Sequence, residues 1–257
     1  MEIKDRIVIV TGGASGLGRA AAESLVNKGA KVALFDLNAK LGEEIAAEIG
    51  QGTIFVPANV ADHAVVDNAV ANVVSQFGTI HVVVNCAGIG KSLKILGKDG
   101  LVSPGFFANM VNVNLVGTFN VIRSTISTLV NNAPNPEGER GVYINTASIA
   151  AFDGQIGQAA YSASKGGVVS MTLTLAREFA NNGIRVMTIL PGVFDTPLMG
   201  RLNEQALERL CKQVPFPARL GKVDEFANLA IHIIENPYLN GEFIRLDGAL
   251  RMGFGRK

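Results

Sequence analysis

Three side chains in one stretch of the chain could move a proton together. Tyr161 and Lys165 are four residues apart, a spacing that places both on one face of a helix. Ser148 follows the apolar run 142–147, so it is expected at the end of a strand. Such a set suits the interconversion of an alcohol and a carbonyl, in which Tyr161 moves the proton and Ser148 holds the oxygen. A Tyr/Lys pair alone is more often a surface pair on an amphipathic helix, so the N-terminal residues decide between these readings.

A glycine-rich turn joins a strand and a helix near the N-terminus. The run 7–10 is apolar and β-branched, which is typical of a strand buried on both faces, and a helix follows from Arg19. Gly12, Gly16 and Gly18 allow a tight turn and a close approach of the backbone. The N-terminus of the helix then offers unpaired N–H groups to a pyrophosphate. Because both flanking elements are of the right kind, the turn predicts a dinucleotide site.

An acidic residue ends the second predicted strand. Asp36 lies 18 residues beyond Gly18, near the place where the dinucleotide fold carries a ribose-binding acid. Its carboxylate would repel a 2′-phosphate by about 1 to 4 kcal/mol at a separation of about 4 Å, and Ser15 places no cation in the turn. We therefore predict NAD over NADP by roughly one to three decades. The alternative is that Asp36 only caps the helix that begins near Asn38.

With an oxidised nicotinamide nearby, Tyr161 could act as the base. A free tyrosine has a pKa of about 10, and neighbouring positive charge favours the phenolate. We expect Lys165 and the nicotinamide to lower the pKa of Tyr161 by about three units, which takes about 4 kcal/mol.

The rest of the chain alternates strands with helices. Further strands are predicted at 53–57, 80–84, 142–147, 184–190 and 242–248, and helices at 38–49, 62–77, 107–130, from Tyr161 onward and 223–234. With no internal repeat or linker, this alternation predicts an α/β fold: one Rossmann-type three-layer domain over 1–257 with a seven-stranded parallel sheet. Residues 198–216 are predicted to form a mobile helical part of a substrate lid around 194–217.

Composition and charge exclude several classes of protein. The net charge of +1 over 257 residues creates no field that would attract nucleic acid or a membrane surface, and no apolar run reaches the roughly 18 residues of a spanning helix. Two cysteines, Cys86 and Cys211, suggest no disulfide framework and a reducing compartment. The three histidines lack metal-ligand partners, so no metal site is expected. We expect a cytoplasmic protein, or a mitochondrial matrix protein in a eukaryote.

Several other positions could line a ligand site. Small residues, Asn85-Cys86-Ala87-Gly88, follow the strand at 80–84, as a backbone that approaches a ligand requires. Asn59-Val60 and Pro191-Gly192 follow two other strands at the same edge of the sheet. Asn114, within a predicted helix, either packs with a local hydrogen bond or perturbs the helix for a site. Lys91, Lys94 and Lys98 are either solvated loop charges or ligands for a phosphate.

Together these motifs resemble the short-chain dehydrogenase/reductase family over essentially the whole chain. The matching pieces are Thr11-Gly12-x-x-x-Gly16-x-Gly18, Asn85-Cys86-Ala87-Gly88, Asn114, Ser148 with Tyr161-x-x-x-Lys165, and Pro191-Gly192. Within the family, the stretches 145–161, 213–221 and 234–248 and the long loop 88–107 resemble enzymes that act on 3-hydroxyacyl-CoA thioesters.

The resemblance implies roles for individual residues. Asn114 would hold a water that links Lys165 to solvent, and Ser148, Gln155, Gln158 and Tyr161 would face the substrate. The family usually has Asp where this chain has Asn59. The amide carries no charge, so the place where the adenine ring of the cofactor would bind lacks a negative charge that the family usually has there. The residues implied for the NAD site are Gly12, Ser15, Gly16, Leu17, Gly18, Asp36, Asn59, Val60, Cys86, Ala87, Gly88, Tyr161, Lys165, Pro191, Gly192, Phe194 and Thr196.

The activity that the resemblance implies is NAD-dependent oxidation of a 3-hydroxyacyl-CoA to the 3-oxoacyl-CoA, a step of the β-oxidation type. The alternatives are an NAD-dependent dehydrogenase of hydroxysteroids or other secondary alcohols, and a dinucleotide-binding scaffold subunit without catalysis. The complete set of Ser148, Tyr161 and Lys165 argues against the scaffold. The family is commonly tetrameric, so a homotetramer is expected, with one interface formed by the helices that begin near Phe107 and Tyr161.

Overall fold

A twisted sheet of parallel strands forms the middle layer. The computed structural model describes residues 1–98, 100–197 and 204–254. Seven strands of these residues form one sheet in the order β3-β2-β1-β4-β7-β8-β9, with every neighbouring pair parallel. They are β1 Ile7–Thr11, β2 Lys31–Asp36, β3 Thr53–Pro57, β4 Val82–Asn85, β7 Gly141–Thr146, β8 Ile184–Pro191 and β9 Phe243–Leu246. The predicted seven-stranded parallel sheet is confirmed.

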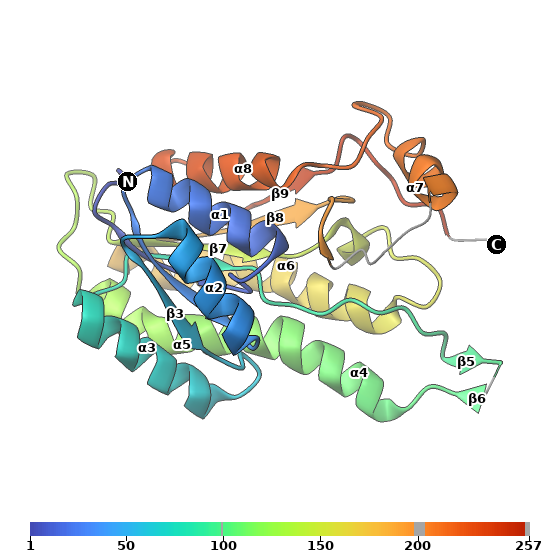
Figure 1. The fold of residues 1–257 in the computed structure, drawn as a ribbon, viewed down its shortest axis with the longest axis horizontal. Helices are drawn as coiled ribbons and strands as arrows, with labels where there is room; N and C mark the ends of the chain where they lie inside the picture. Colours follow the sequence, from blue (N-terminus) through green and yellow to red (C-terminus); the bar gives the residue numbers. More distant parts are fainter. Residues whose placement is uncertain (99, 198–203, 255–257) are drawn as a thin grey trace.

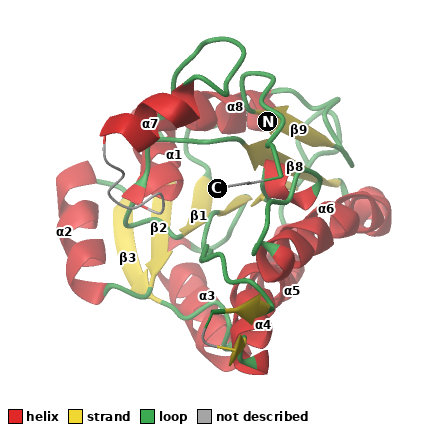
Figure 2. Cartoon of the chain, turned by 90° about the vertical axis from the view of Figure 1, so that its right-hand side faces the viewer, coloured by secondary structure: helices red, strands yellow, loops and turns green. Residues whose placement is uncertain are grey.

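Helices cover both faces of this sheet, which confirms the three-layer prediction (Figures 1 and 2). One face carries α1 Gly16–Asn27, α2 Ala39–Ile49 and α8 Val223–Glu235. The opposite face carries α3 His63–Phe77, α5 Gly117–Val130 and α6 Ala159–Phe179. Two further helices, α4 Pro104–Val111 and α7 Glu204–Cys211, extend the helical layers.

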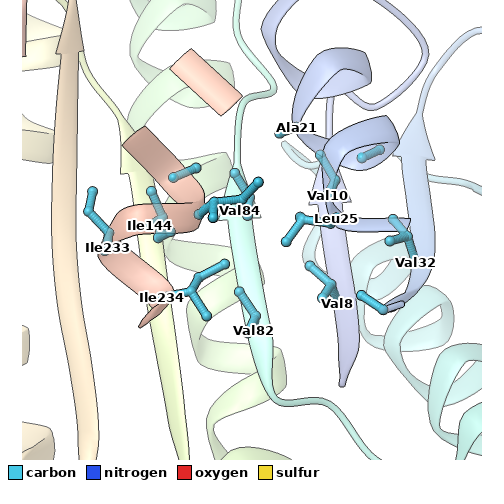
Figure 3. Packing of buried hydrophobic residues seen from close by; sticks show 14 of the residues in the cluster. Val8, Val10, Ala21, Leu25, Val32, Val82, Val84, Ile144, Ile233 and Ile234 are labelled. Carbon is cyan, nitrogen blue, oxygen red and sulfur yellow. The ribbon is translucent and has the colours of Figure 1, made fainter. Parts of the chain in front are cut away.

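Burial on both faces explains the unbroken apolar runs of the central strands. All five residues of β1 are buried, and Val8 and Val10 point to the side of α1 and α8. Figure 3 shows these valines with Val82 of β4, packed among Leu25 and Ile234. Because both faces are covered, these strands show no alternation of polar and apolar residues.

The order of the strands creates the place for a ligand. From β1 the chain proceeds outward to β2 and β3, then crosses back to β4 on the other side of β1. The connections that follow β1 and β4 therefore leave in opposite directions, and a crevice opens at the carboxyl ends of these strands.

The helix predicted at 107–130 has a different geometry. It begins at Pro104 and contains a five-residue π-helical turn, Asn112–Val116 (η1), between α4 and α5. Such turns widen the helix by one residue and often occur at functional sites. Here the π-turn contains the fully buried Asn114.

Two other predictions need correction. Residues 88–107 were expected to be a polar loop, but they include a short antiparallel hairpin of β5 Leu96–Gly97 and β6 Gly100–Leu101. The predicted lid helix at 198–216 is shorter in the described residues, where α7 covers Glu204–Cys211. Residues 198–203 of that prediction lie outside the described residues.

One helical segment, Pro104–Val130, is long and apolar enough to cross a membrane when only length and composition are considered. The same test is met by core helices. In this fold α5 packs against α3, β4 and β7, and α4 packs against α6. These contacts, and the buried polar residues Asn114 and Asn120, show one side of the segment packed into the fold.

His81, directly before β4, gives a testable dependence of stability on pH. Its Nδ1 accepts a hydrogen bond from the Ile7 N–H (3.1 Å), and burial, with a smaller effect of Arg6, lowers its pKa to about 4. Between pH 6.5 and 4 the unfolded chain binds a proton that the folded chain does not bind, so the free energy of unfolding falls as the pH falls. In His81→Asn, the amide oxygen keeps an acceptor at the place of Nδ1 but does not titrate. Urea unfolding should therefore show a smaller fall in the free energy of unfolding from pH 7 to pH 5 than in the wild-type protein. Equal losses in both proteins would contradict this account.

Candidate active site

One cavity of about 910 Å³ lies where the strands end. It is lined by the turn after β1, by the ends of β2, β3, β4, β7 and β8, and by part of α7. All the residues predicted to bind cofactor or substrate line it; of the predicted site residues, only Asn114 does not. Lys91, Lys94 and Lys98 are exposed and do not line it. The sequence patterns thus converge on one place in the fold.

The glycine-rich turn is built on contact between backbone segments. Gly12 has a φ of +64°, and a Cβ at Gly18 would lie 2.2 Å from the Gly12 carbonyl oxygen. Helix α1 begins directly after Ser15, whose side chain makes no capping hydrogen bond. The Ser15 side chain therefore does not occupy the first N–H groups of α1. This arrangement fits a pyrophosphate at the helix N-terminus.

Asp36 faces the turn and does not cap α2. Its Oδ2 accepts a hydrogen bond from the Ala14 N–H (3.2 Å), and its Oδ1 accepts one from the Asn38 N–H (3.1 Å). The cap of α2 is Asn38, whose Oδ1 accepts from the Leu41 N–H (3.2 Å). The alternative of a helix-capping Asp36 is wrong, and the carboxylate lines the cavity.

Asn59 and Val60 form the wall at the end of β3. The Asn59 Oδ1 accepts a hydrogen bond from the Ala61 N–H (3.1 Å), which closes a local turn. The Val60 carbonyl accepts from Asn120 Nδ2 (2.9 Å), which ties this wall to α5. The side-chain oxygen of Asn59, the residue that stands where the family usually has Asp, is therefore already hydrogen-bonded to a backbone N–H group.

Ser148, Tyr161 and Lys165 all line this cavity. Ser148 follows β7, begins the 3₁₀ helix η2 (Ile149–Ala151), and accepts a hydrogen bond from the Ala150 N–H (3.1 Å). Tyr161 and Lys165 lie in the first two turns of α6, with the Lys165 Nζ 5.9 Å from the centre of the Tyr161 ring. Lys165 donates a hydrogen bond to the Thr146 carbonyl (2.8 Å).

Burial has the largest effect on the ionisation of Tyr161 and Lys165. Burial raises the pKa of Tyr161, and a hydrogen bond with Ser148 only partly offsets the rise. Burial also lowers the pKa of Lys165 to about 8. The predicted lowering of the pKa of Tyr161 requires an oxidised nicotinamide as well as Lys165 and stays a prediction, because in the protein alone desolvation of the phenolate dominates. A positive charge on the ligand would have to supply the difference.

Asn114 acts as a connector between three segments. Its Oδ1 accepts a hydrogen bond from the Ile89 N–H (2.8 Å), and its Nδ2 donates to the Ile89 carbonyl and to Ser164 Oγ (3.0 Å each). A Cβ on Gly88 would lie 3.1 Å from Asn114 Oδ1 and 3.5 Å from Lys165 Nζ. The side chain thus holds the segment after β4 against α6 through hydrogen bonds to residues 25 and 50 positions away. Its role in a water relay stays a prediction.

Cys86 is buried next to this set and is not suited to nucleophilic chemistry. Burial raises the pKa of its thiol to about 11, and its Sγ accepts a hydrogen bond from Thr146 Oγ1 (3.4 Å). A small cysteine at this position fits a close wall of the cavity.

Parts of the lining were not named individually from the sequence. They come from the α7 segment, which falls within the predicted substrate lid around 194–217, and from the C-terminal tail, which no prediction covered. Residues 206, 209, 210 and 213 follow a helical spacing that could have indicated one face of a helix. The lining residues in these two segments are Ala206, Arg209, Leu210, Gln213 and Met252. Among the described residues no group of three or more His, Cys, Asp or Glu could hold a metal ion.

Comparison with known proteins identifies the family. The sequence profile described as short chain dehydrogenase matches residues 6–207. This chain belongs to the short-chain dehydrogenase family. The dehydrogenase is 52% identical to human "3-hydroxyacyl-CoA dehydrogenase type-2" and 50% identical to the Drosophila melanogaster protein of that name, in each case over 252 residues. These alignments cover 97% of this chain, and 97% and 99% of the human and fly chains respectively.

Solved structures agree with this assignment. The dehydrogenase is 39% identical to a 3-hydroxyacyl-CoA dehydrogenase type-2 from Mycobacterium avium, with a TM-score of 0.93 over 99% of this chain and 98% of that chain. It is 30% identical to a 3-ketoacyl-(acyl-carrier-protein) reductase from Brucella melitensis complexed with NADH, with a TM-score of 0.88 over 97% and 100% of the two chains. The protein is an oxidoreductase of this family, which uses a nicotinamide dinucleotide and a small-molecule substrate.

The close contact at Gly18 predicts the result of a single added methyl group. In Gly18→Ala the Cβ would collide with the Gly12 carbonyl, so the turn must shift and the N–H groups of α1 must move with it. We expect the affinity for NADH, measured by fluorescence titration, to fall by at least about tenfold, equivalent to about 1.4 kcal/mol. Gly166→Ala is the control, because nothing lies within 4 Å of the position that its Cβ would take and the site is in a helix. An NADH affinity equal to that of the control would contradict the role of this contact.

Proposed function

We propose that this dehydrogenase interconverts a 3-hydroxyacyl-CoA and the corresponding 3-oxoacyl-CoA with NAD as cofactor. The observation that carries the proposal is the convergence of Ser148, Tyr161 and Lys165 in one cavity, in a chain that resembles 3-hydroxyacyl-CoA dehydrogenases over 97% of its length. A step of this kind belongs to the β-oxidation type of fatty acid metabolism.

The protein groups divide the work of proton transfer. Ser148 Oγ holds the substrate oxygen, and the Tyr161 hydroxyl takes the proton from the alcohol or returns it to the carbonyl. Lys165, positioned by the Thr146 carbonyl, holds the nicotinamide ribose and supplies positive charge near Tyr161. When bound, the nicotinamide exchanges a hydride with the carbon that carries this oxygen.

Because the pKa of Tyr161 is raised, reduction of the carbonyl and oxidation of the alcohol place different demands on the charge state of this side chain. For reduction of the carbonyl, a protonated Tyr161 is already the form that burial favours. For oxidation, the phenolate must be stabilised by added positive charge, which an oxidised nicotinamide carries. The burial of this tyrosine therefore links its charge state to the redox state of the cofactor.

The assignment of Tyr161 is tested by Tyr161→Phe. Oxidation of NADH by acetoacetyl-CoA, followed by the loss of absorbance at about 340 nm, should slow by about 10²–10⁴-fold because the general acid is missing. Tyr238→Phe is the control, since Tyr238 is 97% exposed and does not line the cavity. A Tyr161→Phe enzyme with near wild-type turnover would show that another group transfers the proton.

The preference for NAD is tested at Asp36. Its carboxylate would oppose the 2′-phosphate of NADP, so the wild-type enzyme should use NADH at least about tenfold better than NADPH, measured as kcat/KM. Asp36→Asn removes the charge and keeps one acceptor oxygen, enough for one of the Ala14 and Asn38 N–H groups, whereas Asp36→Ala removes the charge and both acceptors. Both variants should narrow the ratio. An unchanged ratio in both would leave Asp36 with only the structural role that its two hydrogen bonds show.

We also propose a homotetramer in which α4, α5 and α6 supply one interface. Phe107, Phe119 and Leu173 are large apolar side chains on these helices, and each is between 45% and 48% exposed. Covering such side chains with a partner surface removes apolar area from water and stabilises the assembly. A cytoplasmic or, in a eukaryote, mitochondrial matrix location remains our proposal from the sequence.

A further inference from the structure

The C-terminal tail, residues 250–254, is fastened beside the loop that joins Ser148 to Tyr161. Arg245, on β9, is the centre of the attachment. It donates from Nε to Asp247 Oδ2 (2.7 Å), and from Nη2 to Asp153 Oδ2 (2.5 Å) and to the Leu250 carbonyl (2.9 Å). The side chains of Arg245, Asp153 and Asp247 are only 17%, 16% and 6% exposed. Partly buried charges that are paired and hydrogen-bonded in this way hold two segments in one register.

Two further hydrogen bonds continue the attachment toward the end of the tail. Gln155 Nε2 donates to the Gly253 carbonyl (3.0 Å), and the Ile156 N–H donates to the Phe254 carbonyl (3.3 Å). Gln155 itself lines the cavity. Met252 lies between Leu250 and Gly253, which are both held by these contacts, so its position is set by the attachment.

Met252 lies on the substrate side of the catalytic residues. Its side chain lines the cavity and packs against the apolar cluster that contains Ala147, Ile149 and Val214. Ala147 and Ile149 flank Ser148, the residue assigned to the substrate oxygen. The cofactor-binding turn after β1 belongs to other elements and makes no part of this cluster.

We propose that Met252 is the apolar wall against which the carbon chain of the substrate packs, so that its size sets the chain length that the enzyme accepts. This inference rests on the proposed function. Asp153 and Arg245 are positioning residues, because they act through the tail and do not line the cavity. A methionine suits this place because its unbranched thioether adapts to a flexible chain.

The test compares two substrates in Met252→Ala and Met252→Phe. The measured quantity is the ratio of kcat/KM for 3-oxodecanoyl-CoA to kcat/KM for acetoacetyl-CoA, with NADH as reductant. Met252→Ala should raise this ratio by about tenfold or more, and Met252→Phe should lower it by a similar factor, because one methylene in an apolar pocket is worth about 10–200-fold. The dissociation constant of NADH, measured by fluorescence without thioester, should stay within about twofold in both variants.

A third variant and a control separate the wall from general damage. Asp153→Asn keeps an acceptor but removes the ion pair with Arg245, which loosens the attachment of the tail. It should therefore raise KM for the longer thioester more than KM for acetoacetyl-CoA. Phe254→Ala, two residues along the tail, keeps the backbone contact with Ile156 and does not line the cavity. It should leave the ratio unchanged.

The outcomes distinguish the two proposals. A ratio that stays within twofold in both Met252 variants, with melting temperature and NADH binding intact, overturns the role of Met252. If the wild-type enzyme reduces neither thioester, the proposed function fails. The same variants are then compared with 2-decanone and 2-butanone as substrates, where a shift in the ratio supports the wall and an unchanged ratio overturns it.

Discussion

The site depends on how closely two backbone segments meet at the end of β1. Gly18 lies so near the Gly12 carbonyl that no Cβ fits between them. On the other side of the turn, Thr11 Oγ1 accepts hydrogen bonds from the N–H groups of Cys86 and Ala87 (3.1 and 3.0 Å). The end of β1 is thus fixed to α1 and to the end of β4 at once. Because the crevice opens at this switch in strand order, the same contacts that close the turn also place the wall on which the cofactor would lie.

Tyr161 and Lys165 are positioned by a second set of contacts, on the other side of β4. The π-helical turn places Asn114 so that its amide joins the Ile89 backbone to Ser164 of α6, one residue before Lys165. Lys165 in turn binds the end of β7 through the Thr146 carbonyl. The register between α6 and the sheet is therefore specified by buried polar groups whose hydrogen-bonding capacity is used within the protein. Buried groups of this kind are costly when misaligned, so they select one arrangement.

Much of this architecture could be predicted from local patterns. The β-branched runs of β1 and β4 required burial on both faces, and the acid at the end of β2 and the Tyr/Lys spacing each carried a geometric consequence that the structure bears out. The π-turn does not follow from the apolar pattern, since five residues are too short a run to show a change of helical period. The direction of the pKa of Tyr161 in the protein alone does not follow from the Tyr/Lys spacing, because burial raises it and the hydrogen bond with Ser148 only partly offsets the rise. The attachment of the tail through Arg245 and Asp153 joins residues 92 positions apart, a distance at which local patterns carry no information.

These differences follow a division within the cavity. The cofactor half is made of backbone groups and glycines at the ends of regular strands, so its constraints are written in residue types at fixed spacings. The substrate half is made of side chains from η2, α7 and the C-terminal tail. Their positions depend on tertiary contacts such as the ion pairs of Arg245. The two parts of the lining can therefore change independently, since the glycine-rich turn and the Tyr161/Lys165 pair belong to regular elements and Met252 belongs to the tail. This separation explains why the strand-end lining could be predicted from the sequence and why the lining by Met252 could not.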